Sequence, residues 1–261
     1  MKVEMGARLL RKIRYLLHPY LITRAVGRFF EARDSQKHCL RLNEYERYSV
    51  SLEKTVEVLV GIEQSRITKA MKKLEASRFL QHIELCKQQA GGIGGPLSDI
   101  LGLLLYLLVR FSRPEVVVET GVASGFSSSF ILKALDRNAK GILHSIDLHC
   151  RAGVMVPLGK ELGWVVPNEI RYRWNLNLGE STKVLPKLLG ELGSIDMFFH
   201  DSRHMYKTMM SEYEIVWPYL KNEGLLLSDD ATSNDAFLDF TDLHKQTPIV
   251  FNRIGAIRKK S

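Results

Sequence analysis

The second half of the chain alternates short apolar runs with stretches of helical periodicity, and this alternation limits the possible folds more than any other feature. Strands are expected at residues 116–119, 141–147, 170–176, 195–199 and 225–227, and helices at residues 97–111, 130–135, 182–192 and 205–217. Residues 248–251 and 256–258 are expected to form a terminal hairpin that turns at Gly255. Strands separated by helices predict an α/β protein with a mostly parallel sheet.

The N-terminal part of the chain shows a different pattern. Residues 1–37 carry nine Lys and Arg against three acidic residues, so they contribute +6 of the net charge of +8. Apolar residues between Leu9 and Leu21 recur at helical spacing, and basic residues fill the other face. Two interpretations stay open: a helix that binds a membrane surface or a partner, and a packing helix with a solvated basic face, which is common in soluble proteins.

The pattern changes again before the alternating half begins. Residues 50–90 predict one or two further helices, and the glycine cluster at residues 91–96 predicts a flexible hinge. The expected organisation is therefore an N-terminal helical segment over residues 1–95, followed by one domain over residues 96–261.

Cysteine content and apolar run length indicate an intracellular protein. The three cysteines are too few for a disulfide framework, and none stands at a metal-binding spacing. The longest apolar run, residues 100–109, is ten residues long, against the roughly 18–20 residues that a membrane span needs. We expect no cleaved signal peptide and a cytoplasmic location, with peripheral membrane contact through residues 1–37 as an alternative. The charge excess lies at one end, so no specific nucleic-acid partner is expected, while a homo-oligomer stays open.

A glycine-containing motif, Glu119-Thr-Gly121-Val-Ala-Ser-Gly125-Phe-Ser127, follows the first predicted strand and opens a helix. Glycines let the backbone turn tightly and approach a ligand closely, and the helix N-terminus behind them favours anionic groups. Ala123 stands where a dinucleotide-binding motif has its second glycine, which disfavours NAD as the ligand. The spacing resembles the first motif of class I S-adenosylmethionine-dependent methyltransferases.

This resemblance implies how the motif contacts its cofactor. Gly121 and Gly125 would lie against the methionine part of S-adenosylmethionine, and Glu119 would hold its amino end. Ser127 closes the same motif and is included among the cofactor-binding residues.

Two further segments fit an adenosine-containing cofactor. Asp147 ends the second predicted strand, 26 residues after Gly121, and a carboxylate there can accept both hydroxyls of a ribose. Glu180 and Ser181 follow the third predicted strand, in a loop that borders the adenine in similar methyltransferases. A helix N-cap is the ordinary alternative role for Ser181.

Acidic residues follow the fourth and fifth predicted strands. Asp201 and His204 stand after the fourth strand, and the pair Asp229-Asp230 stands after the fifth. If the two strands are neighbours, these carboxylates share one crevice and need a positive partner. Mg²⁺ is a hard cation that oxygen ligands hold in this way. Two unrelated strand-end turns are the alternative, because Asp is common in turns.

The residues around these acids carry a second resemblance. Residues 198–206, taken with residues 224–230, resemble the metal-dependent O-methyltransferases, above all the macrocin and mycinamicin group of sugar O-methyltransferases. The catechol and caffeoyl-CoA enzymes are similar, but carry Lys at the position of His204 and Asp-Asn at the acidic pair. The macrolide enzymes have Glu-Asp where this chain has Asp229-Asp230.

The resemblance implies that Asp201, Asp229 and Asp230 bind a divalent metal and that His204 is the general base. A hydroxyl is a poor nucleophile until a metal lowers its pKa and a base takes its proton. Residues 150–167 and 234–246 are expected to be loops that contribute to the choice of acceptor.

The prediction is therefore an S-adenosylmethionine-dependent methyltransferase (EC 2.1.1.-) with a Rossmann-like, seven-stranded, mostly parallel sheet and helices on both faces. Its expected reaction is O-methylation of a small molecule, such as a sugar or natural product, with Mg²⁺ or another divalent cation. Three alternatives stay open: a metal-independent methyltransferase, an NAD-type oxidoreductase, and a non-catalytic scaffold docked to a membrane.

Overall fold

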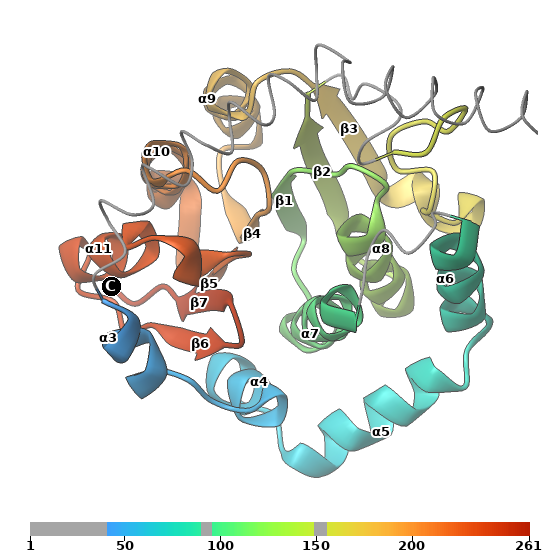
Figure 1. The fold of residues 1–261 in the computed structure, drawn as a ribbon, viewed down its shortest axis with the longest axis horizontal. Helices are drawn as coiled ribbons and strands as arrows, with labels where there is room; N and C mark the ends of the chain where they lie inside the picture. The colour runs from blue at the N-terminus through green and yellow to red at the C-terminus, as the bar shows by residue number, and fades with distance from the viewer. Residues whose placement is uncertain (1–40, 90–95, 149–155) are drawn as a thin grey trace, which may run out of the picture.

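A twisted seven-stranded sheet forms the centre of the computed structural model, which describes residues 41–89, 96–148 and 156–261 (Figure 1). The strand order is β3-β2-β1-β4-β5-β7-β6. The strands are β1 Val116–Thr120, β2 Ile142–Asp147, β3 Trp174–Leu178, β4 Ile195–His200, β5 Leu220–Ser228, β6 Ile249–Phe251 and β7 Ile254–Arg258. The expected α/β class, the count of seven strands and the mostly parallel sheet are confirmed.

Strand direction brings the polar segments to one edge of the sheet. Strands β1 to β5 run parallel, whereas β7 runs antiparallel to β5 and pairs with β6. β1 lies between β2 and β4, so the chain leaves neighbouring strands toward opposite sides of the sheet at this point. Ligands of such sheets bind in the crevice beyond the carboxyl ends of the strands.

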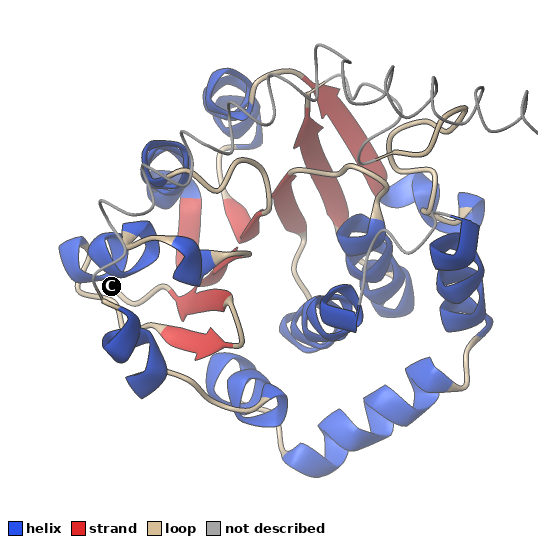
Figure 2. Cartoon of the chain, in the orientation of Figure 1, coloured by secondary structure: helices blue, strands red, loops and turns tan. Residues whose placement is uncertain are grey.

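Helices cover both faces of the sheet, as Figure 2 shows. One face packs its alternate residues, such as Val117 and Phe199, against α7 and α8. The other face packs Val118 and Phe198 against α9, α10 and α11. These helices are α7 Pro96–Ser112, α8 Phe126–Asn138, α9 Ser181–Leu192, α10 Tyr206–Val216 and α11 Ala236–Leu243. Because side chains alternate along a buried strand, each strand supplies both halves of the core.

The segment before residue 90 packs against this core. It contains α3 Leu42–Arg47, α4 Leu52–Val60, α5 Gln64–Glu75 and α6 Arg78–Gln89, one helix more than expected after residue 50. Residues 48–50 run along the outer edge of β6, where the Val50 N–H donates to the Val250 carbonyl at 2.9 Å. The Phe79 ring of α6 meets the Phe130 ring of α8 edge-on. The division of the chain near residue 95 stays a prediction.

Three local expectations were wrong. The third strand begins at Trp174, because the residues after Pro167 form a short 3-10 helix, Asn168–Arg173. The expected loop at 234–246 contains α11, whose apolar face is buried. The terminal hairpin turns before Gly255, which lies inside β7, where a Cβ would meet the Phe237 ring at 2.6 Å.

Two other expectations lie outside the described residues: the basic helix at 1–37, and the glycine cluster apart from Pro96, where α7 begins. Among the described residues, no helix has the length and apolar character that a membrane crossing requires.

Candidate functional site

Three loops meet beyond the carboxyl ends of β1, β4 and β5. The Asp201 N–H donates to the Thr120 carbonyl at 2.8 Å, and the Asp229 N–H donates to the His200 carbonyl at 2.8 Å. These backbone bonds continue the sheet pairing for one residue beyond the strands. They hold the glycine loop, the Asp201 loop and the acidic pair side by side.

The glycine motif forms a tight loop between β1 and α8. Gly121 and Gly125 both have φ of +89°, a region that L-residues avoid. A Cβ on Gly121 would lie 1.9 Å from the Asp201 carbonyl oxygen, so only glycine permits this approach of the two loops. Asp147 Oδ2 accepts hydrogen bonds from the backbone N–H groups of Val122 and Ala123, each at 2.7 Å. Asp147 therefore fixes the loop beside which it was expected to bind a ribose.

The Glu119 carboxylate lies beneath this loop, fully buried. It accepts hydrogen bonds from the hydroxyls of Ser127, Ser128 and Ser145 at 2.6–2.7 Å. Burial raises its pKa above the ordinary value, and the three hydroxyls oppose that shift. Glu119 and Ser127 thus tie the start of α8 to β1 and β2, and their contact with a cofactor stays a prediction.

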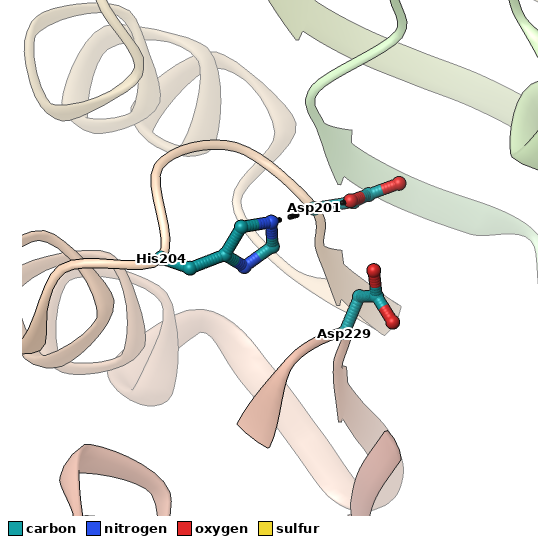
Figure 3. Close-up of side chains that lie close together, drawn as sticks. All are labelled: Asp201, His204 and Asp229. Carbon is teal, nitrogen blue, oxygen red and sulfur yellow. Dashed lines mark ion pairs between the residues drawn. The ribbon is translucent and has the colours of Figure 1, made fainter. Parts of the chain in front are cut away.

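The acidic residues do come together, as the shared-crevice interpretation requires. One ligand atom each from Asp201, His204 and Asp229 lies within 4.8 Å of the others (Figure 3). His204 Nε2 lies 3.7 Å from Asp201 Oδ1 and 3.7 Å from Asp230 Oδ2. Asp229 is 4% exposed, and its Oδ1 has no hydrogen-bond partner among the described residues. A buried carboxylate oxygen without a donor fits a cation ligand, so these residues fit a divalent metal.

Burial and charge shift the protonation of this cluster. Burial and the carboxylates of Asp229 and Glu119 raise the pKa of Asp201 well above its ordinary value. Burial and the nearby His200 lower the pKa of His204, although Asp230 and Asp229 oppose this. The His204 imidazole is therefore neutral at pH 7, so it can accept a proton or ligate a metal.

Arg253, which the sequence reasoning missed, supplies positive charge to the acidic pair. It lies in the turn between β6 and β7, with Nη2 2.9 Å from Asp229 Oδ2 and Nη1 3.0 Å from Asp230 Oδ1. Burial alone would lower the pKa of Arg253, but Asp229 and Asp230 raise it above its ordinary value. No local sequence pattern predicts this residue, because its ion pairs join the β6–β7 turn to the loop after β5. These two segments meet only through the pairing of the antiparallel strands.

A second missed residue, Glu212 on α10, organises the loops from below. Its buried carboxylate accepts hydrogen bonds from the hydroxyls of Thr120 and Ser202, each at 2.6 Å, and contacts His200 Nδ1 at 2.7 Å. It also accepts the Ser181 hydroxyl. The sequence does contain a sign of this role. Glu212 stands at helical spacing among buried apolar residues of α10, and a charge in such a position needs hydrogen-bond partners.

In the loop after β3, Ser181 does not have the N-cap role that was its ordinary alternative. Glu180 is the residue that precedes α9, and its side chain pairs with Lys183 at 2.7 Å on the surface. Ser181 is the first helical residue rather than the N-cap, and its hydroxyl points to Glu212. The adenine-bordering role of both residues stays a prediction.

Comparison with known protein families gives one match for this part of the chain. Residues 118–231 match a family model described as a methyltransferase domain, which spans the sheet from β1 to the acidic pair. No curated protein matches the chain. The glycine loop and the acidic cluster both lie within the residues that match this model.

Solved structures agree on the fold. The S-adenosylhomocysteine-bound methyltransferase PaMTH1 of Podospora anserina is 14% identical, with a TM-score of 0.52, over 76% of this chain and 97% of that one. A Staphylococcus aureus protein provisionally described as a caffeoyl-CoA O-methyltransferase is 15% identical, with a TM-score of 0.53, over 74% and 98%. A Geobacter sulfurreducens methyltransferase is 20% identical, with a TM-score of 0.50, over 77% and 98%. At these identities the likeness concerns the fold.

Proposed function

We propose that this chain, an S-adenosylmethionine-dependent methyltransferase by its domain and fold, methylates a hydroxyl oxygen of a small molecule with the help of a divalent metal. The observation that carries the proposal is the cluster of Asp201, His204 and Asp229 directly beside the glycine loop. A sugar or another natural product rich in hydroxyls is the acceptor class that we favour.

Each residue has a proposed role in this reaction. Asp201 and Asp229 would hold the metal, which would supply a positive charge that stabilises the deprotonated acceptor oxygen. His204 would take the hydroxyl proton through Nε2, the nitrogen that faces the carboxylates. Asp230 would stabilise the imidazolium that forms on His204 and pair with Arg253. The acceptor oxygen forms its bond to the methyl carbon as the carbon–sulfur bond breaks, which leaves a neutral thioether.

The residues expected to bind the methyl donor keep their proposed roles. Gly121, Gly125 and the loop that Asp147 fixes offer backbone close to the Asp201 loop. The positioning of donor and acceptor in one crevice supplies a large part of the rate, because methyl transfer requires an in-line approach. The match to a methyltransferase domain speaks against the oxidoreductase alternative.

A metal-independent methyltransferase is the second candidate. One observation favours it: Arg253 already pairs with both acidic residues of the loop after β5, so these carboxylates have a positive partner without a metal. In that case His204 would still act as the base. S-adenosylhomocysteine formation from a panel of hydroxyl-bearing small molecules, measured with Mg²⁺ and with a chelator, separates the two candidates. Turnover that the chelator stops supports the metal-assisted reaction, and insensitive turnover contradicts it.

His204 is expected to set the acidic limb of the pH–rate profile. Because burial and His200 lower its pKa, the proton-accepting form persists below pH 6.5, and activity should fall only at lower pH. In His204→Gln we expect activity to fall by roughly 10²–10⁴ and the limb to disappear. Mn²⁺ binding by this variant is the control. Retained binding supports the role of base, and lost binding would make His204 a metal ligand instead.

A further inference from the structure

Arg253 is held in place by the backbone as well as by charge. Asn252, just before it in the β6–β7 turn, has φ of +55°, and the Arg253 carbonyl accepts the Ala231 N–H at 2.9 Å. That bond ties the turn to the segment that follows the acidic pair. The guanidinium therefore approaches Asp229 and Asp230 from a fixed direction, with one nitrogen for each carboxylate.

The pairing occupies one oxygen of each carboxylate. Arg253 takes Asp229 Oδ2, while Asp229 Oδ1 is buried and has no hydrogen-bond partner among the described residues. It also takes Asp230 Oδ1, and Asp230 does not belong to the three residues whose ligand atoms gather. A metal at that cluster would share the Asp229 carboxylate with a guanidinium. Two cations on one buried carboxylate repel each other strongly.

We propose that Arg253 is an internal cation that competes with the divalent metal and sets the metal concentration at which the site fills; this inference rests on the metal-assisted function proposed above. With Arg253 paired, the acidic pair is neutralised in part and holds a metal weakly. Loss of the pairing exposes the full charge of both carboxylates. Arg253 occupies one oxygen of each carboxylate and leaves Asp229 Oδ1, and Asp230 Oδ2 beside His204, for other partners.

A purely structural role for Arg253 makes the opposite prediction. If the guanidinium only holds Asp229 and Asp230 in the geometry that a metal needs, its removal weakens metal binding. If it competes, removal strengthens binding. The sign of the change in affinity therefore separates the two roles without any assay of turnover.

The experiment is a titration of the full chain with Mn²⁺, in which the electron paramagnetic resonance signal reports the free ion. Arg253→Gln is compared with wild type, with Arg253→Lys and with Arg258→Gln. Arg258 lies on the same hairpin and pairs with Glu223 at 2.7 Å, near the opposite end of β5, so it is a matched control. We expect Arg253→Gln to bind Mn²⁺ about tenfold more tightly or better, and Arg258→Gln to match wild type.

Each outcome decides one of the two proposals. The competition is overturned if Arg253→Gln binds Mn²⁺ as tightly as wild type or more weakly. The metal-assisted function is kept in that case if wild type binds Mn²⁺ and Asp201→Asn does not. Binding by Arg253→Gln alone supports the competition and overturns metal assistance in the wild type. Absence of binding in every variant overturns both. If Arg253→Gln melts at a lower temperature than wild type, Arg253→Lys decides, because a single ammonium does not reproduce the paired contacts of the guanidinium with both carboxylates. Competition then predicts tighter Mn²⁺ binding than wild type, and equal or weaker binding overturns it.

Discussion

Replacement of Gly121 by alanine is expected to abolish S-adenosylmethionine binding and to lower the free energy of unfolding by about 3 kcal/mol or more. The added Cβ would stand 1.9 Å from the Asp201 carbonyl oxygen, at a φ of +89°. The loop after β1 must then move away from the loop after β4, or the β4 loop must yield. Either shift separates the proposed donor site from the acidic cluster.

Gly193→Ala is the matched control for this prediction. Gly193 has φ of +72°, but a Cβ there would meet no atom within 4 Å. It follows α9 and precedes β4, at the other end of the sheet from the site. Its replacement should cost only the backbone strain, about 1–3 kcal/mol, and leave cofactor binding intact. Thermal unfolding and cofactor titration of both variants measure the difference. Equal behaviour of the two would contradict the packing role of Gly121.

Asp229→Asn is expected to reduce methyl transfer by roughly 10²–10³ and to abolish Mn²⁺ binding. The change replaces a buried carboxylate of the cluster whose Oδ1 has no hydrogen-bond partner among the described residues, and it removes a charge that Arg253 also uses. Because the amide keeps the shape of the side chain, the fold should survive. Turnover and Mn²⁺ titration on the same preparation check both effects.

Asp230→Asn tests whether Asp230 belongs to the metal ligands, as the sequence resemblance implies. The sequence-based set contains Asp201, Asp229 and Asp230, whereas the gathered ligand atoms belong to Asp201, His204 and Asp229. We therefore expect Asp230→Asn to keep most Mn²⁺ binding. A loss as large as that of Asp229→Asn would make Asp230 a metal ligand, as the sequence resemblance implies.

The sheet and the polar segments at its edge could be predicted from the sequence, because both depend on local patterns. Apolar runs such as 116–119 and 195–199 end directly in polar residues, and parallel neighbours bring those ends together. The meeting of Asp201 with Asp229 therefore followed from strand order alone. The glycine loop could be predicted from the sequence, because only glycine tolerates its backbone angles and its contact with Asp201.

The rest of the site depends on contacts that no local pattern contains. Arg253 reaches the acidic pair through an antiparallel hairpin near the end of the chain. Three serine hydroxyls hold Glu119 beneath the loop, and one of them, Ser145, comes from the neighbouring strand β2. The contact of Glu119 with the cofactor stays a prediction. The α11 helix was missed because the burial of Phe237 and Phe240 depends on contacts with Tyr213 of α10 and, for Phe237, with Gly255 of β7.

Calorimetric titration of S-adenosylmethionine, with and without Mg²⁺, into wild type and Asp147→Ala tests the central claim most directly. Asp147 holds the N–H groups of Val122 and Ala123, so its removal should release the loop expected to receive the methyl donor. The account predicts saturable binding to wild type and its loss in a variant that still melts cooperatively. Absence of binding to wild type in both conditions, or equal binding by the two proteins, would contradict it.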